Sequence, residues 1–173
     1  MIPMFRALTA RETECRIGRV TQNGVMLLLY KNARADMSIL DEAVGAENWQ
    51  RDHYECKGNL YCRVGIRIER ENGAEWVWKS DCGAESMMEK AKSESSDSFK
   101  RSCVCWGIGR ELYTAPNIFI RPQDCNITKD DKCYDKFYVR ELDVKDGKIT
   151  HVVIYNAAQN IRRNVYEYPK TKV

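Results

Sequence analysis

One stretch of the chain concentrates residue types that could do chemistry: SDSFKRSCVCWGIGRELYTAP, residues 96–116. A helix-like pattern places Lys100 and Arg101 side by side, and a tryptophan, two glycines and Arg110 follow. Adjacent cations can bind phosphate oxygens, whereas closely spaced glycines occur both in nucleotide-binding loops and at helix ends. The stretch is therefore a nucleotide loop, an ordinary helix end or a surface for a nucleic-acid backbone.

The two glycines, Gly107 and Gly109, do not fit a nucleotide-binding loop. Phosphates bind at helix N-termini, where free N–H groups and the positive end of the helix dipole point at them. Here the glycines follow the predicted helix, and neither a third glycine nor a P-loop Gly-Lys-Ser/Thr sequence accompanies them. We predict instead that Gly107 ends the helix in the left-handed conformation.

The cations of the predicted helix allow two interpretations. Acidic residues come early in the helix and Lys100 and Arg101 come late, which favours a purely electrostatic role at the two helix ends. However, Ser93, Ser96 and Lys100 share one side, Arg101 is adjacent, and Lys92 opens the same region. Small hydroxyl groups beside paired cations form a surface that a phosphodiester backbone can approach closely.

A magnesium-dependent nuclease is the enzymatic alternative. Asp41, followed by Glu55 and Lys57, imitates the acidic residue plus Glu-x-Lys arrangement that holds magnesium and a general base. So short a pattern arises easily by chance in a chain with 31% charged residues, and exposure at a strand end explains Glu55 and Lys57 equally well. Neither His53 nor His151 has a neighbouring serine or cysteine arrangement typical of a catalytic triad.

The eight cysteines have spacings that argue against zinc and against disulfides. No Cys-x-x-Cys pair occurs, whereas zinc ligands usually come as two close pairs. We expect reduced, mostly buried thiols, and neither a metal nor a cofactor.

Trp76 and Trp78 occupy alternate positions of a predicted strand, so both rings should point to one face. Aromatic rings can stack on bases, but two large rings on a meander belong more often to the core. The same holds for Tyr61 and Tyr113. We therefore expect these rings in the core.

The elements that position these residues follow from hydrophobic periodicity and turn chemistry. Asn-Gly, Gly-Asn and Asp-Gly turns join successive strands as hairpins. The order is ββαβββα followed by a hairpin, which predicts the α+β class with an antiparallel meander packed on a long helix. Strands are predicted at Glu14–Val20, Val25–Lys31, Trp49–Cys56, Leu60–Arg70, Glu75–Ser80, Phe137–Val144 and Ile149–Tyr155, and helices at Ala35–Val44 and about Ser86–Trp106. The buried stripe predicted for the long helix comprises Met88, Ala91, Ser95, Phe99, Cys103 and Trp106.

The length of 173 residues predicts a single domain over 1–173, with a core at about 14–120, a hairpin at 137–155 and a basic tail at 156–173. The net charge of +3 is too small to prove a nucleic-acid partner, so any basic surface must be local. No window is long and apolar enough to cross a bilayer. The N-terminal residues lack the apolar core of a signal peptide, so we expect a cytosolic protein.

Two separate motifs resemble a known family. One is Ser-Asp-Ser-Phe-Lys-Arg-Ser-Cys followed by Trp-Gly-Ile-Gly-Arg-Glu-Leu-Tyr, within 96–113. The other comprises Tyr-Lys-Asn-Ala-Arg at 30–34 and Leu-Asp-Glu-Ala-Val-Gly-Ala-Glu-Asn-Trp at 40–49. Together they resemble the Rad-fifty-two superfamily of single-strand annealing proteins, above all its phage recombinases of the Sak type. The similarity covers roughly 14–120.

The resemblance implies a βββα core that assembles into rings or filaments, holds single-stranded DNA in a basic groove and anneals complementary strands without ATP. By position, Lys100 and Arg101 match the main backbone-binding pair of the family. Lys92 matches another basic position, Arg34 lies at or beside a groove arginine, and Arg110 belongs to the phage-type motif.

We therefore expect a non-enzymatic protein of DNA recombination and repair, encoded by a phage and acting in the bacterial cytoplasm. Its expected partners are single-stranded DNA, further copies of itself and a host single-stranded DNA-binding protein, with no membrane. A structural oligomer that binds no nucleic acid is the third interpretation. This interpretation assigns no common function to the four cations Arg34, Lys92, Lys100 and Arg101.

Overall fold

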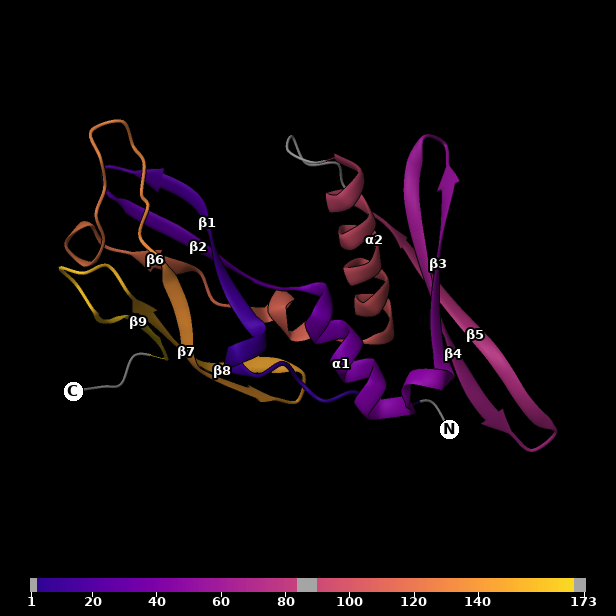
Figure 1. Cartoon of the computed structure of the whole chain (residues 1–173). Coiled ribbons are helices and arrows are strands. Elements are labelled where there is room, and N and C mark those ends of the chain that lie inside the picture. The colour runs from indigo at the N-terminus through magenta and orange to yellow at the C-terminus, as the bar shows by residue number, and fades with distance from the viewer. Residues whose placement is uncertain (1–2, 84–89, 170–173) are drawn as a thin grey trace. The chain divides into compact units, whose positions relative to one another are not determined.

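The computed structural model describes residues 3–83 and 90–169, and within them the chain forms two helices and nine strands (Figure 1). The strands pair antiparallel in two sheets, which confirms the predicted α+β class. The chain divides into two compact units, one made of Met1–Arg6 and Asn32–Gly109 and the other of Ala7–Lys31 and Arg110–Val173. Among the described residues, no helix is long and apolar enough to span a bilayer.

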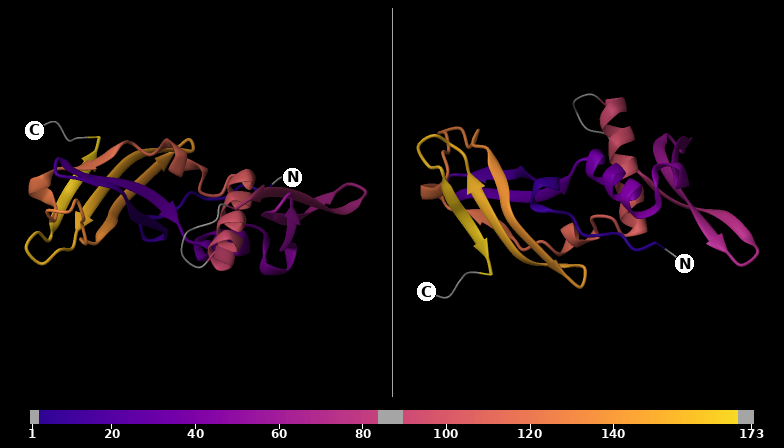
Figure 2. Two further views of the ribbon diagram at one scale, coloured as in Figure 1. Left: turned by 90° about the horizontal axis from the view of Figure 1, so that it is seen from above. Right: turned by 60° about the horizontal axis from the view of Figure 1, so that its bottom comes forward.

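The first unit is a three-stranded meander with two helices. Turns of two residues join its strands, and Lys57 and Gly58 both have positive φ (53° and 75°), the geometry of a tight hairpin turn. One helix packs on β4 and β5, and the two helices contact each other (Figures 1 and 2). The elements are α1 (Ala33–Val44), β3 (Trp49–Cys56), β4 (Asn59–Arg70), β5 (Gly73–Cys82) and α2 (Lys90–Trp106).

The core of the first unit lies between the meander and the helices. Alternate residues of the central strand β4 are buried because one face of the sheet is covered. Three members of the stripe predicted for α2 are buried as expected, Ser95 is half-buried, and Met88 and the side chain of Ala91 lie outside the described residues. The core residues include Cys62, Val64, Ile66 and Ile68 from β4, Phe99, Cys103 and Trp106 from α2, and Ile39 and Leu40 from α1.

The second unit is a six-stranded sheet in the order β6-β2-β1-β7-β8-β9, with curved strands (Figure 2). Strands from the start and the end of the chain join through one residue pair, Glu14 with Tyr138. Its core combines Val25 and Leu27 with Val152 and Ile154. The strands are β1 (Thr13–Thr21), β2 (Gly24–Lys31), β6 (Ile118–Ile120), β7 (Phe137–Lys145), β8 (Lys148–Asn156) and β9 (Arg163–Tyr168).

The two edge strands, β6 and β9, were not predicted. β6 is only three residues long, and β9 lacks an apolar alternation that would reveal it. The prediction of a basic tail from residue 156 was therefore wrong in part, because 163–168 pairs with β8. Arg163 of this segment is also bound, since its Nη2 lies 2.7 Å from Oδ1 of the buried Asp124. The predicted hairpin at 137–155 thus belongs to a larger sheet.

Candidate nucleic-acid interface

Polar side chains fasten α2 to the meander in addition to its apolar stripe. Trp106 Nε1 donates to the carbonyl oxygen of Val64 (2.9 Å). Ser102 Oγ lies 2.6 Å from the carbonyl oxygen of Cys62 and accepts from the N–H of Asp81 (3.0 Å). Because these bonds reach the backbone of both β4 and β5, they fix the rotation of the helix about its own axis. They therefore also fix which side chains of α2 face away from the sheet.

Polar side chains in the first half of α2 also bond to the meander. Glu94 Oε1 accepts from the N–H of Leu60 (2.9 Å), and Ser95 Oγ lies 3.1 Å from Nε2 of His53. The chain leaving β5 passes so close to the helix that a Cβ on Gly83 would come within 2.3 Å of the Glu94 carbonyl oxygen. Glycine is therefore required at position 83 for close approach of two backbones.

The glycines of the 96–116 stretch end α2. The N–H of Gly107 donates to the carbonyl of Val104 (2.9 Å), and that of Ile108 donates to the carbonyl of Cys103 (3.0 Å). This pair of bonds is the Schellman motif, and Gly107 has the positive φ (106°) that it requires. The predicted helix end is confirmed. These glycines satisfy carbonyl groups of a C-terminus, which is not the end of a helix that attracts phosphate.

Lys100 and Arg101 lie off the buried stripe of α2, with 26% and 44% of their side chains exposed. Lys100 Nζ is 3.8 Å from Oδ1 of Asp97, and Arg101 Nη2 is 3.3 Å from Oδ2 of Asp81. Ion pairs at the surface contribute about 0–1 kcal/mol, so a phosphate could replace either carboxylate at little cost. The arrangement suits reversible binding of an anionic backbone.

The other three predicted cations occupy different elements. Arg34 is exposed at the start of α1, where the side chain of Asn32 caps the helix by accepting from the N–H groups of Arg34 (3.0 Å) and Ala35 (3.1 Å). Lys92 lies on α2, but its side chain is outside the described residues. Arg110 is exposed and belongs to the second unit, where it begins a short 3-10 helix. The first unit thus carries four of the five predicted cations on its two helices.

The predicted nuclease constellation is not assembled. Asp41 Oδ1 accepts a hydrogen bond from the indole Nε1 of Trp49 (2.6 Å), at the first residue of β3. Glu55 lies six residues further along the same strand, about 20 Å away at the usual rise of a β-strand, and Lys57 lies in the turn that follows. Within the described residues, no group of three or more His, Cys, Asp or Glu side chains could hold a metal ion.

The cysteines are free thiols, of which three are buried, four are half-buried and Cys56 is exposed. Cys62, Cys103 and Cys125 are buried, as predicted. Of the other five cysteines, all but Cys56 are half-buried, so the prediction holds for them only in part. Burial disfavours the thiolate and raises the pKa of Cys62 to about 11 and that of Cys15 to about 12.

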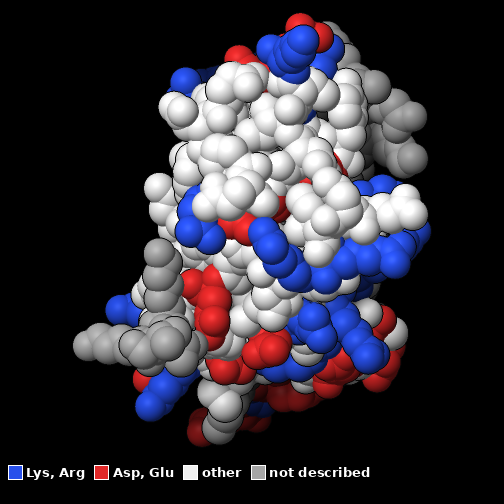
Figure 3. All heavy atoms as spheres, turned by 90° about the vertical axis from the view of Figure 1, so that its left-hand side faces the viewer, with Lys and Arg blue, Asp and Glu red and all other residues white. Residues whose placement is uncertain are grey.

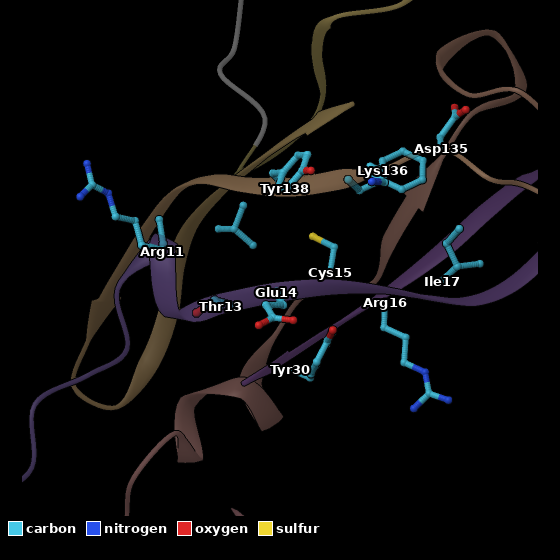
Figure 4. Close-up of a pocket in the computed structure, with 13 residues that line it drawn as sticks. Arg11, Thr13, Glu14, Cys15, Arg16, Ile17, Tyr30, Asp135, Lys136 and Tyr138 are labelled. Atoms are coloured by element: carbon cyan, nitrogen blue, oxygen red, sulfur yellow. The ribbon is translucent and has the colours of Figure 1, made fainter. Parts of the chain in front are cut away.

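A pocket of about 760 Å³ lies in the second unit, between β1 and β7 (Figure 4). Glu14 and Tyr30 lie close together at its wall, and a hydrogen bond with Glu14 is the main cause that raises the pKa of Tyr30 to about 12. On the molecular face of Figure 3, basic side chains gather in a band across the right half, and acidic side chains lie mainly below it and to its left. In the described part of the chain, none of the predicted DNA-contacting cations lines this pocket.

Comparison with known proteins identifies the family. The family model described as "Rad52/22 family double-strand break repair protein" matches residues 6–132. The searches of curated proteins and of solved structures found no match. The matched range contains α1, the meander, α2 and all five predicted cations. Because this range is more than half of the chain, the protein belongs to the Rad52/22 family of double-strand break repair proteins, and its role lies in DNA recombination and repair.

Proposed function

We propose that this protein binds single-stranded DNA and anneals complementary strands without ATP and without catalysing a covalent reaction. The observation that carries the proposal is the pair of half-buried Lys100 and exposed Arg101 on α2, which lie off the side of the helix that is fastened to the meander. A cation pair on a rigidly held helix presents its charges in a constant position. Such a position is what repeated contact with a regular phosphate backbone requires.

The proposed mechanism is an exchange of anions followed by base pairing. Phosphates replace Asp97 beside Lys100 and Asp81 beside Arg101, and counterions released from the strand supply most of the affinity. Contacts to the backbone carry no sequence information, so the bases remain available to a second strand. We include Arg34, Lys92 and Arg110 as further residues that bind the backbone.

The proposal also covers the oligomeric state, the origin and location of the protein, and its protein partner. We propose a homo-oligomeric ring or filament, because one short cation pair holds few phosphates and a row of subunits binds many. The Trp-Gly-Ile-Gly-Arg motif at 106–110 supports a phage-encoded protein of the Sak type that acts in the bacterial cytoplasm. A host single-stranded DNA-binding protein is its proposed protein partner. Light scattering should give a mass several times 20.1 kDa.

The central experiment compares two double variants with the same change in net charge. Lys100→Ala with Arg101→Ala removes the proposed phosphate-binding pair, whereas Lys145→Ala with Lys148→Ala removes two exposed cations from the β7–β8 hairpin. Titration of labelled oligonucleotides at several salt concentrations measures how many phosphates each variant binds. The salt slope should fall by about 0.7 for each phosphate that is no longer bound, and it should fall in the first variant alone.

Annealing of two complementary labelled strands should be abolished in the Lys100 and Arg101 variant and preserved in the hairpin control. Circular dichroism should show the same fold for both, because neither residue of the pair belongs to the buried stripe. Equal annealing rates and equal salt slopes for the variant and the wild type would refute the proposal. Cleavage of the strands in the presence of Mg²⁺ would refute its non-enzymatic part.

A further inference from the structure

The face of the meander opposite α2 carries exposed aromatic rings. Because Cys62, Val64 and Ile66 of β4 point toward α2, their neighbours along the strand point the other way, and so do the residues paired with those neighbours. The expectation of core positions was wrong for Trp76 and Trp78, which are 40% and 36% exposed, and for Tyr113 of the second unit, which is 72% exposed, whereas Tyr61 is half-buried. We call this surface the outer aromatic face; it comprises Tyr54, Tyr61, Arg63, Arg67, Trp76 and Trp78.

The rings of the outer aromatic face are held in place by the sheet. Tyr54 and Tyr61 lie opposite each other on β3 and β4 and stack, with ring centroids 5.5 Å apart. The rings of Trp76 and Trp78 are neighbours on β5, 6.2 Å apart. Trp78 also covers Gly65 of β4, since a Cβ there would lie 2.8 Å from its ring atoms. Rings fixed in this way lose little conformational freedom when a ligand stacks on them.

The charges of this face are balanced. Arg63 lies over the ring of Trp78, with 4.7 Å from its Cζ to the ring centroid, and its Nη2 is 2.9 Å from Oδ2 of Asp52. Arg67 Nη1 is 2.7 Å from Oε1 of Glu69. With each arginine beside a carboxylate, phosphate attraction is weaker here than at a cation pair. A ligand would therefore contact this face mainly through its aromatic rings.

We propose that the outer aromatic face binds the bases of single-stranded DNA by stacking. Aromatic side chains on the open face of an antiparallel sheet, with helices behind it, are the arrangement that RNA-recognition modules use to stack bases. Such stacking tolerates any sequence because every base has a π-face. A protein partner fits less well, because Arg63 and its carboxylate partner lie at the middle of the surface and the centres of protein interfaces are depleted of acidic residues.

This inference rests on the proposed function, since it concerns the same strand, but it places the bases of one stretch on the outer aromatic face and the phosphates of another stretch at α2, because the sheet lies between the two surfaces. The two surfaces should therefore respond to different probes. An oligonucleotide of thymidine presents bases and phosphates, whereas an abasic oligonucleotide of the same length presents phosphates alone. The ratio of the two affinities measures the contribution of the bases.

The test uses two double variants of the same pair of residues. Trp76→Phe with Trp78→Phe keeps flat rings and should bind nearly as the wild type does. Trp76→Leu with Trp78→Leu keeps apolar cover over the sheet but removes stacking, and its affinity for the thymidine oligonucleotide should fall roughly 5- to 100-fold. Its affinity for the abasic oligonucleotide and its salt slope should not change. Tyr134→Leu, at a 76% exposed tyrosine of the second unit, is the control.

The outcomes separate this inference from the proposed function. If the wild type binds neither oligonucleotide, the proposed function fails and the inference fails with it. If it binds thymidine more tightly than the abasic strand and the leucine variant keeps that ratio, only the inference fails. A change in mass by light scattering with an unchanged ratio would assign the face to contacts between copies and would also overturn it. Should the double leucine variant unfold, Trp76→Leu alone provides the same readout, since Trp78 then still covers Gly65.

Discussion

The two faces of the β3–β4–β5 meander are made from the same strands but have opposite roles. On the inner face, Lys79 Nζ binds the carbonyl of Cys105 (3.0 Å) at the C-terminal end of α2 and lies 4.5 Å from the centre of the Trp106 ring. A cation at this helix end is stabilised by the dipole. On the outer face, the neighbouring Trp78 remains 36% exposed beside a surface ion pair.

The difference shows that residue type does not decide which face of a sheet becomes core. A lysine points inward and two tryptophans point outward on β5, because one face is covered by a helix that offers acceptors, whereas on the other face both rings remain exposed in the part of the chain that the structure describes. Long charged side chains can pack their stems along apolar groups while their heads reach a partner. The inner face thus stabilises the unit, whereas the outer face keeps two tryptophan rings exposed.

The largest expected loss of stability follows removal of a tryptophan from the inner face, and the same change on the outer face should cost much less. Trp106→Ala should cost about 3–5 kcal/mol, because it opens a cavity in the core beneath α2 and removes the donor to the Val64 carbonyl. Trp76→Ala should cost about 1 kcal/mol or less, since its ring is already 40% exposed. Urea denaturation followed by circular dichroism measures both. Equal losses would show that the outer face is as tightly packed as the inner one.

The next largest loss of stability is expected from removing a serine hydroxyl on α2, compared with one on β5. Ser102→Ala should cost about 1–3 kcal/mol, because the buried hydroxyl of Ser102 accepts from the partly buried Asp81 N–H, which would lose that acceptor. Ser80→Ala, at an exposed position of the outer face, is the matched control and should stay within about 0.5 kcal/mol of the wild type. The same denaturation experiment compares them. If Ser102→Ala were neutral, the polar fastening of α2 would be redundant.

The thiols of the two faces should differ in reactivity. Cys56 is exposed at the end of β3, whereas Cys62 is buried on the inner face and its pKa is raised from the ordinary 9.0 to about 11. Because the thiolate is the reactive species, alkylation at pH 8 followed by mass spectrometry should modify Cys56 well before Cys62. A faster reaction at Cys62 would indicate that α2 opens from the sheet.

The same raised pKa sets the direction of a pH effect. Since the folded state keeps the Cys62 proton above the unfolded-state pKa, its contribution to stability is present below about pH 9 and is lost as the pH rises toward 11. Cys62→Ser should flatten this decline in the free energy of unfolding. The decline should be unaffected by Cys56→Ser, which serves as the control.

The smallest effect is expected from the ion pair of the outer face. Asp52→Asn should destabilise the protein by less than about 1 kcal/mol, because both Arg63 and Asp52 are about half exposed. Salt should remove the difference, since it screens exposed charges. Thermal unfolding at low and high ionic strength measures it. A larger, salt-independent loss would mean that this pair is part of a buried network.

Local sequence patterns were enough to predict most elements and the main features of the candidate site. Asn-Gly and Asp-Gly turns identified the hairpins, Gly107 identified the end of α2, and spacing placed Lys100 and Arg101 off the stripe of Phe99 and Cys103. These features depend on interactions between residues close in the chain. Spacing and turn chemistry are therefore sufficient to predict them.

Which strands meet and which faces are covered depended on the folded chain. β6 is ordered by pairing with β2, which is distant in sequence, and β9 follows β8 without a strong apolar alternation of its own, so local pattern revealed neither strand. Alternation placed Trp76 and Trp78 on one face of β5, but the packing of α2 on the opposite face left this one open. Likewise, the sequence allowed Asp41 and Glu55 to share a metal site, but Asp41 contacts the first residue of β3 and Glu55 lies near the other end of this strand. The physical reason is that burial and pairing arise from contacts between distant segments, which a local pattern does not contain.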